Sequence, residues 1–188
     1  MTDVMLVWDA PLLFEKLFNE CGLKCQRILS VAIGTPFLPP SKCLVVPTGF
    51  ANPSYTKILR GIESNARALE RFVQGGGTLV VFGAVVPEYR YGWLPFELEY
   101  VEKHGETSLV SIGEHDIQCI VDDPAEPVEC DGYFSRTDGQ VIFKNSDGQP
   151  VMVAQVSGEG LIVATTIHEF PSTDFVRCVV GRAKWTKV

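Results

Sequence analysis

Apolar and polar positions alternate in blocks over the first part of the chain. Short apolar runs, at 4–8, 25–33, 43–46 and 78–82, have the length of buried strands. Residues 55–73 instead repeat apolar side chains every three or four positions, which predicts an amphipathic helix that ends at three consecutive glycines. A shorter helix is predicted after Pro11. Such alternation predicts a parallel sheet with helices on both faces and right-handed crossovers.

The second half of the chain has a different pattern. Short strands separated by polar turns are predicted at 98–101, 108–112, 117–121, 133–134, 140–144, 151–156 and 161–167. Asn145-Ser146-Asp147-Gly148 is typical of a hairpin turn between two of them. A last helix is predicted after Pro171. The pattern therefore predicts an α/β fold whose central, mainly parallel sheet gains antiparallel strands in the C-terminal half.

Composition narrows the class of protein. A chain of 188 residues with 46% hydrophobic and 21% charged residues is ordinary for one globular domain, 1–188. Its net charge of -7 disfavours a nucleic-acid partner, because an acidic surface repels phosphate. No apolar run reaches the roughly 18–20 residues that span a bilayer, so we expect no membrane association. The N-terminus lacks the basic segment of a secretory signal, so we expect a cytoplasmic protein with six cysteine thiols.

Three predicted strands end in residues that suit a ligand site. Asp9, Thr48-Gly49-Phe50 and Gly83-Ala84-Val85 all follow strands whose carboxyl ends meet at one edge of a parallel sheet. A glycine there allows backbone N–H groups to face a carboxylate or an oxyanion, although a tight turn would need the same glycine. Val85 holds the position of a nucleophile and has only a hydrocarbon side chain, so no covalent intermediate can form there.

Further candidates lie in three other segments. His168-Glu169 closes the last predicted strand, where the histidine is either an acid–base or binding group or a plain surface residue. The segment from Tyr89 to Phe96 contains Arg90 and Trp93; it could line a pocket, form a homo-oligomer interface, or pack as a buried loop. Metal-capable side chains at 114–116, 119 and 130–131 match no familiar spacing. We therefore expect no metal and no cofactor.

In order along the chain, these motifs resemble the class I glutamine amidotransferase-like superfamily. Residues 45–50 are similar to its strand and oxyanion loop, 78–85 to the strand that enters its nucleophile turn, and 158–169 to the strand that delivers its histidine. Val85 stands where the family has cysteine, Pro87 where it has the second glycine, and Phe170 where its acid usually lies. The resemblance implies a flavodoxin-like three-layer sandwich in one amidotransferase-like domain. It implies the site's location but not glutaminase activity.

Together these features predict a non-catalytic domain that binds a small molecule or assembles with other proteins. The alternative is a hydrolase or isomerase for a small polar substrate, with His168, Glu169 and Asp9 as acid–base groups beside Thr48. A third hypothesis is a subunit that docks through the segment from Tyr89 to Phe96. The distance of His168 from Thr48 and Val85 separates the first two hypotheses.

Overall fold

A computed structural model describes residues 1–168 and 170–188. The strands are β1 (Thr2–Val7), β2 (Cys25–Ile28), β3 (Ser41–Val46), β4 (Thr78–Val81), β5 (Glu88–Arg90), β6 (Leu98–Thr107), β7 (Val110–Ser111), β8 (Val128–Thr137), β9 (Gln140–Lys144), β10 (Pro150–Ser157) and β11 (Gly160–Thr165). The helices are α1 (Leu13–Glu20), α2 (Leu59–Ser64), α3 (Ala66–Gln74) and α4 (Thr173–Gly181), with short 3₁₀ helices η1 (Ser30–Ala32) and η2 (Asp116–Ile120).

Eight strands form one mixed sheet in the order β2-β1-β3-β4-β11-β10-β9-β7. The first five are parallel to one another, whereas β10, β9 and β7 are joined to them and to each other by antiparallel pairings. The parallel strands β3 and β4 are apolar and buried along almost their whole length, as expected where both faces of a sheet are covered.

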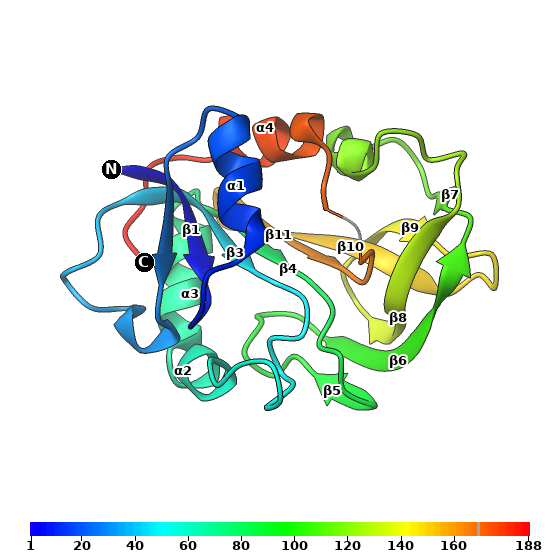
Figure 1. Ribbon diagram of the computed structural model, residues 1–188, viewed down its shortest axis with the longest axis horizontal. Coiled ribbons are helices and arrows are strands. Elements are labelled where there is room, and N and C mark those ends of the chain that lie inside the picture. The colour runs from blue at the N-terminus through cyan, green and yellow to red at the C-terminus, as the bar shows by residue number, and fades with distance from the viewer. Residues whose placement is uncertain (169) are drawn as a thin grey trace.

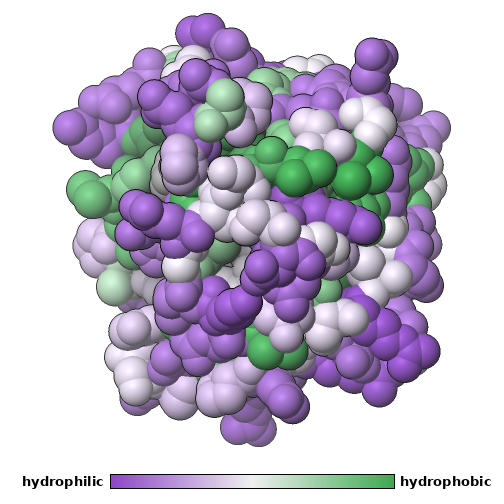
Figure 2. Space-filling view, turned by 90° about the vertical axis from the view of Figure 1, so that its right-hand side faces the viewer, coloured by the Kyte–Doolittle hydropathy of each residue, from purple (hydrophilic) through white to green (hydrophobic). Residues whose placement is uncertain are grey.

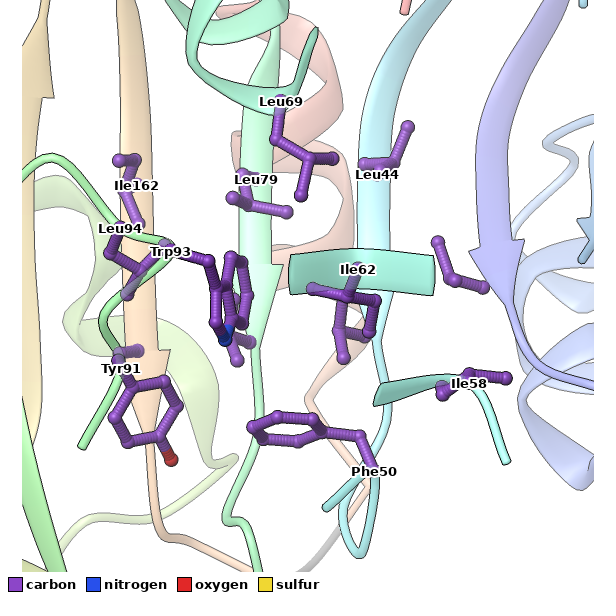
Figure 3. Close-up of a cluster of buried hydrophobic side chains, with 14 of the residues drawn as sticks. Leu44, Phe50, Ile58, Ile62, Leu69, Leu79, Tyr91, Trp93, Leu94 and Ile162 are labelled. Carbon is purple, nitrogen blue, oxygen red and sulfur yellow. The ribbon is translucent and has the colours of Figure 1, made fainter. Parts of the chain in front are cut away.

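Helices cover both faces of the parallel half of the sheet. On one face α1 and α4 contribute buried side chains such as Phe14 and Phe175 to an apolar cluster with Val45 and Val80. Figure 1 shows these two helices side by side above the sheet. On the other face Ile62 of α2 and Leu69 and Phe72 of α3 pack on Leu44 and Leu79 (Figure 3).

A second sheet, β5-β6-β8, is antiparallel throughout. Its buried residues Leu98, Tyr100 and Phe134 join the same apolar cluster as α2 and α3. From Glu102 to Thr107, β6 is largely solvent-exposed, and this part of the strand pairs with β8 without a helix covering it. The apolar cluster under α2 and α3 is therefore completed by the second sheet rather than by a further helix.

The expected flavodoxin-like three-layer sandwich is therefore wrong. The prediction extended the alternation of the first 82 residues to a chain whose residues 98–157 form strands that pair antiparallel, and antiparallel strands need no crossover helix. Two local predictions also fail. Of the predicted strand 117–121, residues 117–120 belong to η2, because His115 Nδ1 accepts the Ile117 N–H and caps a helical turn. The long helix is divided at Asn65 into α2 and α3.

Along residues 1–168 and 170–188, no helix has the length and apolar character needed to cross a membrane.

Candidate functional site

The centre of the candidate site is the carboxylate of Asp131, in the middle of β8. The residue has 0% of its surface exposed. Its Oδ2 accepts a hydrogen bond from the Thr48 hydroxyl, and its Oδ1 lies 2.6 Å from Nδ1 of His168. A buried carboxylate is tolerated only when its oxygens are paired in this way. The charge therefore joins three segments that are distant in the sequence: the residues after β3, the middle of β8, and the residues after β11.

The carboxyl ends of the parallel strands build the floor under this carboxylate. Thr48 follows β3 and Gly83 follows β4, and the Gly49 N–H donates to the Gly83 carbonyl at 2.8 Å. A Cβ on Gly83 would lie 2.6 Å from Asp131 Oδ2, inside van der Waals contact. Glycine is needed here for close approach. The hydroxyl of Tyr100 in β6 donates to the Asp131 carbonyl at 3.0 Å and holds β8 from the other side.

A second histidine reaches the same carboxylate oxygen. His104 of β6 has Nδ1 3.8 Å from Asp131 Oδ1 and Nε2 3.1 Å from Oε1 of Glu102. The His168 side chain is 48% exposed, and with Nδ1 facing Asp131 its Nε2 lies on the far side of the ring. An open pocket of about 330 Å³ is lined by His104, Gly105, Glu129, Cys130 and His168. The arrangement is an imidazole–carboxylate pair at the wall of a small polar pocket.

Val85 lies at the end of β4, two residues beyond Gly83, in a left-handed conformation with φ 53°. That conformation is costly for a β-branched residue and is found where neighbours enforce it. Asn52 Nδ2 donates to the Val85 carbonyl at 2.9 Å, and the Tyr100 hydroxyl accepts from the Val85 backbone. The strained position therefore holds a mostly buried hydrocarbon, which can offer no electron pair to a substrate.

Asp9 has a local structural role at the end of β1. Its carboxylate accepts the Thr56 hydroxyl at 2.8 Å and the Lys57 N–H at 2.9 Å. Desolvation raises the pKa of this carboxyl, but the hydrogen bonds from Lys57 and Thr56 outweigh it, so the net pKa is lowered. These contacts hold the loop that precedes α2.

Phe50 and the segment from Tyr89 to Phe96 form mainly an aromatic core. Phe50, Tyr91 and Trp93 are 0%, 1% and 5% exposed, and their rings pack against one another (Figure 3). Trp93 Nε1 donates to the Tyr89 hydroxyl at 3.1 Å. Arg90 is exposed and lies 3.9 Å from Glu99. Trp93 is therefore placed for packing, and a homo-oligomer through this segment stays a prediction.

The remaining candidates have separate outcomes. Ala84 is fully buried beside Val85. Glu169 lies outside the described residues. His115 Nδ1 lies 2.8 Å from Asp116 Oδ1 and caps η2. Within the described ranges 1–168 and 170–188, no group of three or more histidine, cysteine or acidic side chains is arranged to hold a metal ion.

Sequence reasoning missed Asp131 as the centre of the site. It lies mid-strand, in Glu129-Cys130-Asp131-Gly132, and mid-strand acids usually face solvent. The available signal was that this Asp lies between Cys130 and Gly132, just before the aromatic pair Tyr133-Phe134 of the same strand. Cys130 is buried, packs among apolar side chains that include Ile167, and also contributes to the lining of the pocket beside His168.

No family model matches the chain, and no curated protein matches it. Solved structures do. The β-galactosidase from Bacillus circulans sp. alkalophilus has a TM-score of 0.55 at 13% identity, over 96% of this chain and 30% of that one. The β-galactosidase from Halorubrum lacusprofundi has a TM-score of 0.58 at 14% identity, over 97% and 30%. A cytoplasmic protein of Salmonella typhimurium LT2 has a TM-score of 0.56 at 12% identity, over 98% and 100%.

The likeness is one of fold. The chain spans about three tenths of the length of the β-galactosidases it matches and the full length of the Salmonella protein. These neighbours overturn the expected resemblance: the structural relatives reported are glycosidases and cytoplasmic proteins, and no class I glutamine amidotransferase is among them. The degenerate strand-end motifs, shared by many sheets with glycine-rich turns, were too unspecific to carry that assignment.

Proposed function

We propose that this chain is a binding module that takes a small hydroxylated ligand, of monosaccharide size, in the pocket beside His168. The observation that carries the proposal is the buried Asp131 carboxylate, 2.6 Å from His168 Nδ1. A histidine held through Nδ1 presents Nε2 in a fixed direction. Fixed polar groups at the wall of a small pocket are what orient a ligand.

The chemistry of the lining supports a neutral, hydroxyl-rich ligand. The pocket offers the His104 and His168 imidazoles together with the Glu129 carboxyl group. Carboxylates accept hydrogen bonds from hydroxyls, and a neutral imidazole both donates and accepts. About 330 Å³ is at the small end of the range of ligand pockets, roughly 300–1,000 Å³. The face that carries the β6 and β8 sheet is mostly hydrophilic, with apolar side chains in separate small patches (Figure 2).

A second candidate function is a hydrolase or isomerase that uses His168 and Glu169 as acid–base groups. The imidazole–carboxylate pair favours it, because a carboxylate on Nδ1 holds the ring in one orientation with Nε2 on the opposite side. Val85 disfavours it, since no nucleophile stands at the strand-end turn and an attacking group would have to be water. The β-galactosidases that share the fold suggest galactose as a test ligand, and an exo-β-1,4-mannosidase that shares it suggests mannose.

Saturation-transfer NMR with D-galactose and D-mannose tests the proposal. We expect transfer from the wild-type protein to one of these sugars, and its loss in His168→Gln. The matched control is His115→Gln, the same replacement at a histidine that caps η2 and does not line the pocket. The absence of transfer in the wild type, or its persistence in His168→Gln, would overturn the proposal. Release of nitrophenol from p-nitrophenyl galactoside or mannoside, abolished by His168→Gln, would establish the enzyme instead.

We place this function in the cytoplasm. All six cysteines are free thiols, which suits a reducing compartment. Fractionation of cells, with the chain followed by an antibody, tests the location.

A further inference from the structure

Two cysteines meet where α4 packs on η2, away from the candidate site. Cys119 belongs to η2 and Cys178 to α4. Their sulfurs lie 3.2 Å and 3.7 Å from one acceptor, the Asp116 carbonyl oxygen. Figure 1 shows α4 beside the short coil of η2 at the top of the molecule. Two thiols that share one acceptor on two packed helices lie in the neighbourhood that a disulfide requires.

The two helices are held together independently of the thiols. The Ser172 N–H donates to the Ile120 carbonyl at 2.8 Å, and its hydroxyl donates to the Cys119 carbonyl. Arg182 Nη1 lies 3.2 Å from Asp116 Oδ2. Contacts on both sides of the sulfur pair therefore limit how far the thiols can separate. Both cysteines are half-buried, so a small oxidant can reach them.

We propose that Cys119 and Cys178 form an intrachain disulfide when the protein reacts with a peroxide. The Cys119 thiolate attacks one peroxide oxygen, the O–O bond breaks, and Cys119 becomes a sulfenic acid while the other oxygen leaves as water after taking a proton. The Cys178 thiolate then attacks that sulfur, the S–O bond breaks, and a second water leaves. One hydrogen peroxide is reduced to two waters as the two thiols lose two electrons and two protons.

The surroundings of the thiols decide the order of the steps. Burial raises the pKa of Cys178 to about 11, and Asp116 raises it further. Burial also raises the pKa of Cys119, but its backbone hydrogen bond and the Cys178 thiol oppose that rise. Cys119 is thus the easier thiol to ionise and Cys178 the one that resolves the sulfenic acid. Because both thiols are mostly protonated at neutral pH, oxidation accelerates as the pH rises toward 9.

Peptide mapping under non-reducing conditions tests the proposal. After hydrogen peroxide treatment we expect the Cys119 and Cys178 peptides to be linked, and dithiothreitol to separate them. In Cys178→Ser, dimedone should label Cys119. In Cys119→Ser, the Cys178 peptide should stay unlabelled over the same time. A labelled Cys178 beside an unlabelled Cys119 would reverse the assigned order and overturn that step.

Cys25 and Cys43 supply the matched control. They lie on β2 and β3, and both pair with Val4 on the intervening strand β1. Because one strand lies between them, their Cα atoms are about two strand spacings apart, roughly 9–10 Å, whereas a disulfide requires less than about 7 Å. The double variant Cys25→Ser/Cys43→Ser should therefore form the Cys119–Cys178 link as fast as the wild type. The proposal is overturned if Cys119 and Cys178 can both still be alkylated after a hydrogen peroxide treatment that fully oxidises free glutathione in a parallel sample. It is also overturned if another pair of cysteines forms a disulfide first.

Discussion

Replacing Gly83 by alanine places a methyl group against the buried carboxylate at the centre of the site. The new Cβ would lie 2.6 Å from Asp131 Oδ2 and 3.1 Å from its Cβ. To restore ordinary contact, at about 3.4 Å or more, the carboxylate must move by roughly 0.8 Å. That movement is opposed on one oxygen by Thr48 and on the other by His168.

The cost follows from these contacts. Inserting a methyl group into a packed interior costs about 1–3 kcal/mol. Weakening one hydrogen bond to a buried charge costs about 1.5–3 kcal/mol more. Since part of the strain is shared, we expect Gly83→Ala to lower the free energy of unfolding by about 2–4 kcal/mol. At roughly 2–4 °C per kcal/mol for a chain of this size, the Tm should fall by about 4–16 °C.

Urea unfolding followed by circular dichroism measures this change, and long-range ¹H–¹⁵N spectra of the imidazoles report the His168–Asp131 contact. Gly92→Ala is the control, because a Cβ there meets nothing within 4 Å and should change stability by less than about 0.5 kcal/mol. If Gly83→Ala loses less than about 0.5 kcal/mol and leaves the His168 nitrogen shifts unchanged, the packing argument for the site is refuted.

Three further predictions follow from other contacts. Asp9→Asn should lower the free energy of unfolding by about 0.5–1 kcal/mol at pH 7, because it weakens the hydrogen bonds to Thr56 and Lys57. Because folding lowers the pKa of Asp9, the stabilisation by this carboxylate is present above pH 3.8 and is lost as the pH falls below it. Unfolding curves across pH 2–7 will show this loss. Trp93→Ala should cost about 3–5 kcal/mol by thermal unfolding, because the ring is 5% exposed; an unfolding curve that superimposes on the wild type would contradict its burial. The oxidised Cys119–Cys178 protein closes a loop of about 60 residues and should gain up to about 4 kcal/mol, seen in calorimetry as a raised Tm that dithiothreitol reverses.

The parallel half of the fold was readable from the sequence because its signals are local. β1, β3, β4 and β11 lie where continuous apolar runs occur, and Thr48, Gly83 and His168 follow three of those strands. In the structure Thr48 and His168 both contact Asp131, and Gly83 lies directly beneath it.

The second half could not be read in the same way, because its pairings are set by contacts between distant strands. β8 pairs with β6, and β10 pairs with β9 and β11, and no local pattern distinguishes these partners from others. Asp131 shows the consequence. In isolation it is one acid among the 23 Asp and Glu residues, and it becomes the site's centre only when β8 crosses the ends of β3 and β11. A buried charge is defined by tertiary structure alone.

The same carboxylate yields a test in which two substitutions should compensate. Asp131→Ala removes the buried charge and leaves the Thr48 hydroxyl and the His168 imidazole without their acceptor, so this substitution should itself destabilise the fold. It also removes the oxygen that a methyl group on Gly83 would meet. The loss of stability in the double variant Gly83→Ala/Asp131→Ala should therefore be smaller than the sum of the two single losses, by a coupling of about 1–2 kcal/mol in urea unfolding. The double variant should still fail to bind the sugar, because His168 has lost its anchor. Additive losses would mean that the methyl group acts elsewhere, and that the carboxylate is not what Gly83 makes room for.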